Sequence, residues 1–325
     1  MTDRWAFHTR EHFDTRMGGA VRGLQRADYC HAVAQDDIDL VLDDLRATIA
    51  PQHGGRLAQL DLGRGPLLRP RDQSDPADPY HWAQWGSYPL APWSNRIADG
   101  RFTFDGVTHQ LPINYPDGTA IHGLVAATAW SVTEQSATSA TLRTTTDTPP
   151  YAVAVEQRFT LHPEGLHQEL AVTNGGDRAV PVGLGIHPWF RASPFWADVS
   201  HMWPAGDDCL PTGPPVPVDA DHDVSLDGEG RRRVPPTIDT CFTGIGERRA
   251  VLDDLIIEWS DDIDHLVVYT GVPGWICVEP VTNANDAFNL DQRGIDGTGT
   301  RVLGPGDSTS CRYRFLVPPG GTGVG

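Results

Sequence analysis

The sequence predicts an all-β protein built as a large antiparallel β-sandwich, and three observations support this fold class. Apolar residues recur at every second position in many short segments, which is the pattern of half-buried strands. The 325 residues include 34 Gly and 27 Pro, the residues that most often separate strands with turns. No convincing amphipathic helix of ten or more residues is indicated. Many short strands without long helices are typical of a sandwich.

The alternation begins well inside the chain, which suggests how the chain is organised. Residues 1–35 are polar and weakly patterned, so we expect them to form an N-terminal extension. Residues 36–317 carry the strand pattern and are expected to form a single domain, which is a normal size for an all-β protein. The Gly-rich tail, 318–325, is expected to be disordered.

Ten segments carry the strand signal, and turn-forming residues separate them. In chain order they are Asp37–Leu42, Leu57–Leu62, Thr128–Gln135, Ala140–Thr146, Val153–Leu161, Leu166–Val172, Leu255–Trp259, Leu266–Tyr269, Trp275–Val278 and Cys311–Val317. The third and fourth are expected to pair as a hairpin. The fifth and sixth, joined by the turn His162–Gly165, form the clearest hairpin in the chain. Arg64–Tyr80 and Pro204–Pro236 are rich in Pro, Gly and Asp and are expected to be irregular.

Charge and composition exclude several classes of function. The formal net charge of −18 disfavours nucleic acid and anionic membranes as partners, because both bind basic surfaces. All 25 basic residues are Arg and there is no Lys. The chemistry of a Schiff-base lysine, of a lysine-bound pyridoxal cofactor and of a P-loop lysine is therefore excluded.

The five cysteines are widely scattered and form no C-x-x-C pair. Neither a zinc knuckle nor a redox motif is indicated, so we expect no metal site. Gly183–Gly185 lacks the spacing of a nucleotide-binding fingerprint, and we expect no cofactor. The first residues lack the apolar core of a signal peptide, and no run is long enough to span a membrane. We expect a reduced cytoplasmic protein.

The segment Gly183–Phe190, G-L-G-I-H-P-W-F, places an ionisable imidazole between an apolar run and an aromatic corner. Pro188 biases His187 towards an extended conformation, so we expect His187 at the end of a strand. Aromatic rings beside a polar tip suit a pocket for a sugar, which has apolar C–H faces and hydroxyl edges. A hydrogen-bonded core histidine remains the alternative.

The segment Trp275–Thr282, W-I-C-V-E-P-V-T, places a carboxylate at the end of an apolar strand. We expect Glu279 to close that strand and Pro280 to end its regular pairing. Burial raises the pKa of such a carboxyl group and makes it a better proton acceptor. A glutamate in apolar surroundings is uncommon without a partner or a function.

Three further polar positions lie in similar settings. Arg96, in W-S-N-R-I, could hold sugar hydroxyls with a fixed guanidinium fork or could form a surface ion pair. Gly123 allows a close backbone approach or a turn, which we expect to leave His122 exposed at a loop edge. Asp239, in T-I-D-T-C-F, could accept hydrogen bonds from a sugar or cap a turn.

Together these motifs resemble the aldose 1-epimerases, or galactose mutarotases. The resemblance consists of N-R-I with a following G-R-F, then I-H-G, H-P-W-F, I-D-T-C-F and V-E-P-V-T-N-A-N-D-A-F-N, in that order. It covers roughly Asp36 to Val317. The resemblance implies the family's large β-sandwich, a galactose mutarotase-like supersandwich, with the site on a concave face. Trp189 stands where many members of the family have tyrosine.

The resemblance also implies roles for individual residues. Glu279 matches the general base that takes the proton from the anomeric hydroxyl, and His187 matches the general acid that protonates the ring oxygen. In this scheme the base and the acid lie on opposite sides of a pyranose. The residues expected to bind the sugar are Arg96, His122 and Asp239, together with Asn95 and Trp189. The implied partner is a monosaccharide, either a free hexose or a free pentose.

Two other functions remain open from the sequence. A hexose-6-phosphate 1-epimerase would need arginines at the pocket rim, which Arg191 and Arg231–Arg233 could supply. A non-catalytic sugar-binding domain on the same fold would bind without turnover, since a fold does not establish an activity.

Overall fold

The computed structural model describes residues 37–318, apart from residues 227, 233–234 and 236. The predicted extension, residues 1–35, and all of the predicted tail except Pro318 lie outside the described residues. Among the described residues the longest helix is α1 (Ala287–Gln292), and almost all other regular structure is β-strand. The predicted all-β fold class is confirmed.

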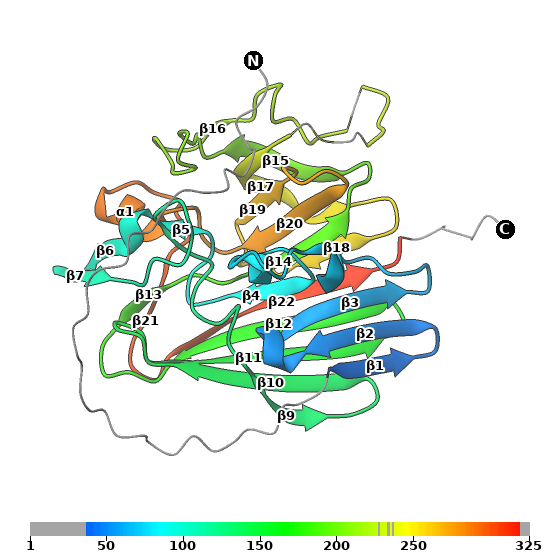
Figure 1. The fold of residues 1–325 in the computed structure, drawn as a ribbon. Helices are drawn as coiled ribbons and strands as arrows, with labels where there is room; N and C mark the ends of the chain where they lie inside the picture. Colours follow the sequence, from blue (N-terminus) through cyan, green and yellow to red (C-terminus); the bar gives the residue numbers. More distant parts are fainter. Residues whose placement is uncertain (1–36, 227, 233–234, 236, 319–325) are drawn as a thin grey trace. The chain divides into compact units, whose positions relative to one another are not determined.

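One long sheet dominates the fold (Figure 1). Its main path runs β1-β2-β3-β4-β14-β20-β19-β17-β18-β22-β12-β11-β10-β9, and neighbouring strands are antiparallel throughout. The strands of one half are β1 (Ile38–Leu42), β2 (Leu45–Ala50), β3 (Arg56–Leu62), β4 (Ser87–Leu90), β14 (Gly185–Arg191), β20 (Trp275–Val281) and β19 (His265–Tyr269). The strands of the other half are β17 (Asp239–Val251), β18 (Ile256–Trp259), β22 (Ser308–Leu316), β12 (Gly165–Asn174), β11 (Val153–His162), β10 (Ser139–Thr146) and β9 (Ser131–Gln135).

The shorter strands lie around this path. Strand β15 (Trp196–Met202) pairs with β17 and with β16 (Val216–Pro217). Three two-stranded sheets complete the fold: β5 (Arg96–Ile97) with β8 (Ala120–Ile121), β6 (Arg101–Phe104) with β7 (Val107–Gln110), and β13 (Val180–Val182) with β21 (Arg301–Leu303).

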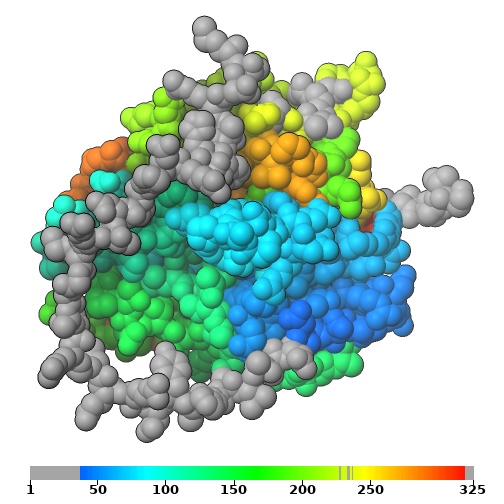
Figure 2. All heavy atoms as spheres, in the orientation of Figure 1, coloured from blue at the N-terminus to red at the C-terminus, as the bar shows by residue number. Residues whose placement is uncertain are grey.

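The two ends of the long sheet meet, so the sheet folds over on itself as a sandwich. The backbone N–H of Val41 in β1 donates to the carbonyl of Ala137 in the turn between β9 and β10, at 2.8 Å. In Figure 2 the blue segment that contains β1 lies beside the green segment that contains β9. Apolar side chains from both halves, such as Leu40 and Val155, are fully buried in one shared core.

The strand predictions are largely confirmed, with differences at the ends of elements. Both predicted hairpins form: β9 pairs with β10, and β11 pairs with β12 over ten residue pairs. The first of them starts later than predicted, at Ser131. Arg64–Tyr80 contains no strand, and the described part of Pro204–Pro236 contains only the two-residue strand β16.

Two predicted strand ends are wrong. His187 lies inside β14, which continues to Arg191, because the extended backbone that Pro188 favours is also the backbone of a strand. Strand β20 runs past Pro280 to Val281, and Pro280 stays in register with Leu266 of β19. Proline removes one N–H but leaves its carbonyl available to a neighbour.

Candidate active site

The register of the sheet brings the two predicted catalytic residues together. Strands β14 and β20 keep one register from the pair Gly185–Val281 to the pair Trp189–Cys277, which places His187 opposite Glu279. Residues opposite one another point to the same face of a sheet. On the far side of β14, Tyr88 of β4 lies opposite His187. Three polar side chains from three strands therefore form one row across this face.

His187 and Glu279 are in direct contact and shielded from solvent. The Nε2 atom of His187 lies 3.2 Å from Oε1 of Glu279, and the two residues are 6% and 2% exposed. The other two polar atoms, Nδ1 of His187 and Oε2 of Glu279, are buried without a hydrogen-bond partner. Buried polar atoms of this kind are uncommon and indicate a place for a bound ligand or a catalytic role.

The surroundings push the two pKa values in opposite directions. Burial raises the pKa of Glu279 well above its usual value; the charge of Asp239 acts in the same direction and that of Arg96 opposes it. Burial also lowers the pKa of His187 to about 3. Both shifts favour neutral forms, so the pair holds one proton that either partner can carry. A carboxyl group and an imidazole whose pKa values are shifted in opposite directions are suited to acid–base chemistry.

Aromatic rings hold His187 in place. The ring of Tyr88 stacks on the imidazole with centroids 4.6 Å apart and planes inclined by 19°. Trp189 lies on the same face, with its centroid 5.7 Å from that of His187, and its Nε1–H donates to the carbonyl of Ala83 at 2.8 Å. The imidazole therefore has a fixed plane, and Trp189 forms a wall beside it.

His122 is buried, so the predicted exposed position is wrong. It is 7% exposed, and its ring lies edge-on to that of His187 with centroids 5.0 Å apart. The backbone explains the burial, because Gly123 adopts a positive φ of 78° and approaches Ala91 closely. A Cβ atom on Gly123 would lie 2.0 Å from the carbonyl oxygen of Ala91. This approach turns His122 inwards, towards β4 and β14.

Arg96 forms the ion pair that the sequence left open as an alternative, with a partner that the sequence did not identify. Its Nε donates to Oδ2 of Asp117 at 2.8 Å, its NH1 lies 3.9 Å from Oδ2 of Asp239, and NH1 also donates to Oδ1 of Asn95 at 3.2 Å. The side chain of Arg96 is 12% exposed and that of Asp239 is 32% exposed. Arg96 therefore pairs with two carboxylates, and its side chain is mostly buried rather than on the open surface.

The next row of the same face adds Cys277, between Trp189 of β14 and Tyr269 of β19. The side chains of His187, Cys277 and Glu279 are close enough to share a metal ion, with ligand atoms within 4.8 Å of one another. However, a metal ion binds cysteine as the thiolate, so the thiol would have to lose its proton in this buried setting. Burial raises the pKa of the Cys277 thiol well above its usual value. Proton transfer fits this arrangement better than metal binding does.

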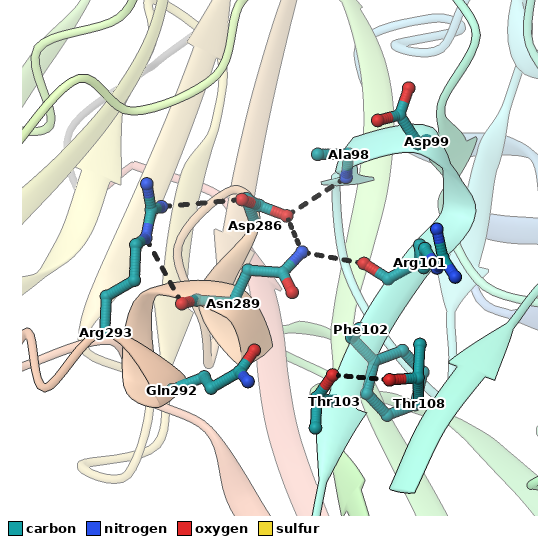
Figure 3. Close-up of a pocket in the computed structure, with 10 residues that line it drawn as sticks. All are labelled: Ala98, Asp99, Arg101, Phe102, Thr103, Thr108, Asp286, Asn289, Gln292 and Arg293. Atoms are coloured by element: carbon teal, nitrogen blue, oxygen red, sulfur yellow. Dashed lines mark hydrogen bonds and ion pairs between the residues drawn. The ribbon is translucent and has the colours of Figure 1, made fainter.

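Asp286 and Asn289 form a clamp beside the strand that carries Arg96; Figure 3 shows both residues with Ala98 and Arg101. The N–H of Asp286 donates to the carbonyl of Arg96 at 2.7 Å, and its Oδ1 accepts from the N–H of Ala98 at 3.0 Å. Asn289 donates from Nδ2 to Oδ1 of Asp286 at 2.6 Å and to the carbonyl of Arg101 at 2.9 Å. The hollow of about 480 Å³ beside this clamp is lined by neither His187 nor Glu279.

Three residues around the site adopt a positive φ without being glycine: Asn95 at 54°, His122 at 60° and Asp286 at 54°. This conformation is unfavourable for most residues, and such positions often mark functional sites. Two of the three are predicted sugar-binding residues. Four other described residues, Asp43, Asp99, Asp105 and Cys209, share this conformation, so it does not by itself mark the site.

The clamp gives a prediction about stability. Replacing Asp286 by alanine is expected to lower the free energy of unfolding by about 2–4 kcal/mol, because the N–H of Ala98 loses its side-chain acceptor and Asn289 loses one of the two acceptors of its amide. Asp286→Asn keeps Oδ1 and tolerates the positive φ, so it should lose less than about 1 kcal/mol. Urea unfolding measures both. Equal stability of Asp286→Ala and of Asp99→Asn, an exposed control beside the same hollow, would show that the clamp is unimportant.

The sequence missed several residues that the fold brings to the site. They are Tyr88, Asp117, Tyr269 and Cys277. Tyr88 and Tyr269 lie in strands whose partners cannot be identified from local alternation. Asp117 lies in the segment Y-P-D-G, which carries a turn signal and gives no sign of its contact with Arg96.

Fold and site together define a class of protein. A large antiparallel sheet carries a buried imidazole–carboxyl pair on one face, with an arginine, a second histidine and an indole around it. This combination is suited to proton transfer at a small polar ligand.

Comparison with known proteins identifies the family. The family model for aldose 1-epimerase matches residues 40–315, and the chain belongs to the aldose 1-epimerase family. It is 42% identical over 163 residues to the uncharacterized protein YihR of Escherichia coli K12, a match covering 48% of this chain and half of YihR. It is 26% identical over 276 residues to the uncharacterized protein YphB of the same organism, covering 78% of this chain and 89% of YphB.

Solved structures share the fold. A putative aldose 1-epimerase from Escherichia coli K12 has a TM-score of 0.75 at 24% identity, covering 87% of this chain and 99% of that chain. A galactose mutarotase-like protein from Clostridium acetobutylicum has a TM-score of 0.73 at 20% identity, covering 87% and 95%. The expected galactose mutarotase-like sandwich is therefore confirmed. No helix among the described residues is long and apolar enough to cross a membrane.

Proposed function

We propose that this protein is an aldose 1-epimerase that interconverts the α and β anomers of a free aldose. The observation that carries the proposal is the buried pair of His187 and Glu279, in contact at 3.2 Å and each with one unpartnered polar atom. Mutarotation needs one group that accepts a proton and one that donates a proton, and no hydride, metal or covalent intermediate.

In the proposed mechanism the pair acts on two oxygens bonded to the same carbon. The carboxylate of Glu279 accepts the proton of the anomeric hydroxyl while the imidazolium of His187 donates a proton to the ring oxygen. The bond between C1 and the ring oxygen breaks, and C1 becomes an aldehyde. After rotation about the C1–C2 bond, the former ring hydroxyl attacks the other face of C1, and both protons return.

The short distance between the two groups changes one part of the expected geometry. An acid and a base on opposite sides of a pyranose would be separated by the sugar, whereas His187 and Glu279 are neighbours. Neighbours are sufficient here, because the anomeric hydroxyl and the ring oxygen are both attached to C1. The sugar would then present its anomeric edge to the pair.

The protonation of the pair fits a cycle that runs in both directions. Before ring opening the single proton is on His187, and after ring opening it is on Glu279. Burial favours the neutral state with protonated Glu279, and the nearby charge of Arg96 favours the carboxylate. The charge of Arg96 therefore opposes the effect of burial on Glu279, and proton transfer through the sugar uses both protonation states of the pair.

The remaining polar residues would hold the sugar. Arg96 and the adjacent Asn95 would bind hydroxyls. The side chain of Arg96 keeps 12% of its surface exposed. His122 would approach the ring oxygen from beside His187. Asp239 would accept hydroxyl protons next to Arg96, and Trp189 would lie against a C–H face.

Polarimetry of freshly dissolved α-anomers tests the proposal. With a panel of free hexoses and pentoses, at least one sugar should reach equilibrium rotation much faster with catalytic amounts of protein than without. If NMR detects sugar binding but no accelerated exchange between anomers, the protein is a binding domain and not an enzyme.

The rival epimerase for hexose 6-phosphates receives less support from the positions of the arginines. Arg231 and Arg232 line a groove with Trp196 and Asp253 that includes none of the predicted site residues, and Arg232 pairs with Asp253 at 3.0 Å. Arg191 lies over Trp275. Glucose and glucose 6-phosphate in the same assay separate the two activities.

A second prediction concerns Asp117, which orients Arg96. Asp117→Asn should raise KM about fivefold with little change in kcat, which corresponds to a loss of about 1 kcal/mol in binding. The reason is that the guanidinium of Arg96 loses the charged partner that orients it before the sugar binds. Saturation kinetics by polarimetry measures both constants. Asp105→Asn, at an exposed turn, should change neither. A lower kcat at unchanged KM would mean that Arg96 acts in the transition state instead.

A further inference from the structure

A second group of metal-ligating side chains lies outside the active site, at the turn between β11 and β12. The turn segment is H-P-E-G-L-H, from His162 to His167. The possible ligand atoms of His162, Glu164 and His167 all lie within 4.8 Å of one another. Among the described residues this is one of two such groups, and the mechanism above makes no use of it.

The spacing inside the group matches that of a coordination shell. Nε2 of His167 lies 3.2 Å from Oε1 of Glu164, and the two imidazole rings have centroids 4.1 Å apart. With metal–ligand bonds of about 2.0–2.2 Å, two ligands of a tetrahedral ion are roughly 3.3 Å apart. The separations of up to 4.8 Å within the group are of the same order.

One ligand atom is also shielded from solvent. Nε2 of His167 is buried, and the carboxylate of Glu164 lies 3.2 Å from it. A shielded nitrogen needs a binding partner, and a cation could be shared by the imidazole and the carboxylate. The shielding therefore agrees with the spacing.

The backbone that carries the ligands is held firmly. His162 pairs with Gly165 at the end of a ladder of ten residue pairs, and β22 pairs along the other side of β12. Gly165 approaches β22 so closely that a Cβ atom would lie 2.0 Å from the carbonyl oxygen of Phe315. Metal ligands on such fixed strands are already oriented before binding.

The neighbouring positive charge, on Arg314, is compensated in part. Arg314 of β22 lies opposite His167, but its guanidinium forms an ion pair with Glu258. The net charge of −18 also favours cations near the surface. Two imidazoles and one carboxylate are ligands typical of Zn²⁺ and of similar borderline metals, and they do not suit Mg²⁺.

We propose that His162, Glu164 and His167 form a binding site for a divalent transition-metal cation of the Zn²⁺ type. Three protein ligands leave a fourth position for water. The bound ion ties the two strands of the longest hairpin together at its turn, and so stabilises the folded chain in proportion to the concentration of free metal.

Titration of the full chain with Zn²⁺ tests the proposal by calorimetry and by thermal unfolding. The wild type should bind one equivalent more than a His162→Ala/His167→Ala double variant. At about a hundredfold excess over Kd, its Tm should rise by roughly 5 °C more than that of the double variant. Mg²⁺ at the same concentration should have no effect.

Two further variants make the result specific. His222→Ala removes an exposed histidine that also pairs with a carboxylate three residues away, Asp219, but has no second imidazole. It should bind Zn²⁺ like the wild type, and His162→Gln should lose the site without truncating the hairpin. Equal stoichiometry and equal Tm shifts for wild type and double variant overturn the proposal, as does an equal loss in His222→Ala.

Discussion

Replacing Glu279 by glutamine is expected to lower the rate of mutarotation by about 10²–10⁴-fold, the usual contribution of a general base. Glutamine has nearly the same shape, but it cannot accept the anomeric proton. The residue is 2% exposed and its Oε2 atom has no hydrogen-bond partner, so the carboxyl group is held where it contributes little to stability. The loss should therefore appear in kcat, with KM nearly unchanged.

The stability of the same variant separates a catalytic role from a structural one. Burial of the Glu279 carboxyl group is unfavourable for stability. Replacing it should therefore leave Tm unchanged or raise it, as is common for residues kept for function. Thermal unfolding and polarimetry on one preparation give both values. A variant with near wild-type turnover would contradict the assigned base, and a variant with a much lower Tm would point to a structural role.

The sequence was sufficient for the fold class because the evidence for it is local. Alternation marks each strand, and hairpins such as β11 with β12 depend on residues close in the chain. The strand order could not be predicted from the sequence. Strands β4, β14 and β20 are neighbours in the sheet, although about a hundred residues separate β4 from β14 and about ninety separate β14 from β20. Such pairings depend on the packing of the whole sheet rather than on any single segment.

The candidate site, like the fold, could be predicted from the sequence only in part. Glu279 and His187 stand out because a charged or ionisable residue interrupts an apolar strand. The orientation of His122 was wrongly predicted, since glycine after a histidine permits either an exposed turn or the close approach to Ala91 that the structure has. Asp117 and Tyr88 carry no distinguishing pattern in the sequence, and only three-dimensional contact reveals them.

His187→Asn is expected to lower kcat by a similar factor of about 10²–10⁴, because the amide cannot donate a proton to the ring oxygen. Loss of the imidazole also removes the stacking with Tyr88, centred at 4.6 Å. Tyr88→Phe is the matched control: it keeps the stacked ring, removes only the hydroxyl that donates to Ala83, and should retain most activity. If Tyr88→Phe were as slow as His187→Asn, the ring environment and not proton donation would limit the rate.

The double variant Glu279→Gln/His187→Asn gives the sharper test, because it asks whether the two residues act as one unit. Because the two side chains are in contact at 3.2 Å, the proposed mechanism requires both proton transfers to occur together. Removing one partner therefore removes the whole pathway, and removing the second should slow the reaction little further. Rates from polarimetry across the four proteins decide this. If the two losses multiply instead, acid and base work in separate steps, and the proposed simultaneous transfer of both protons at the sugar is wrong.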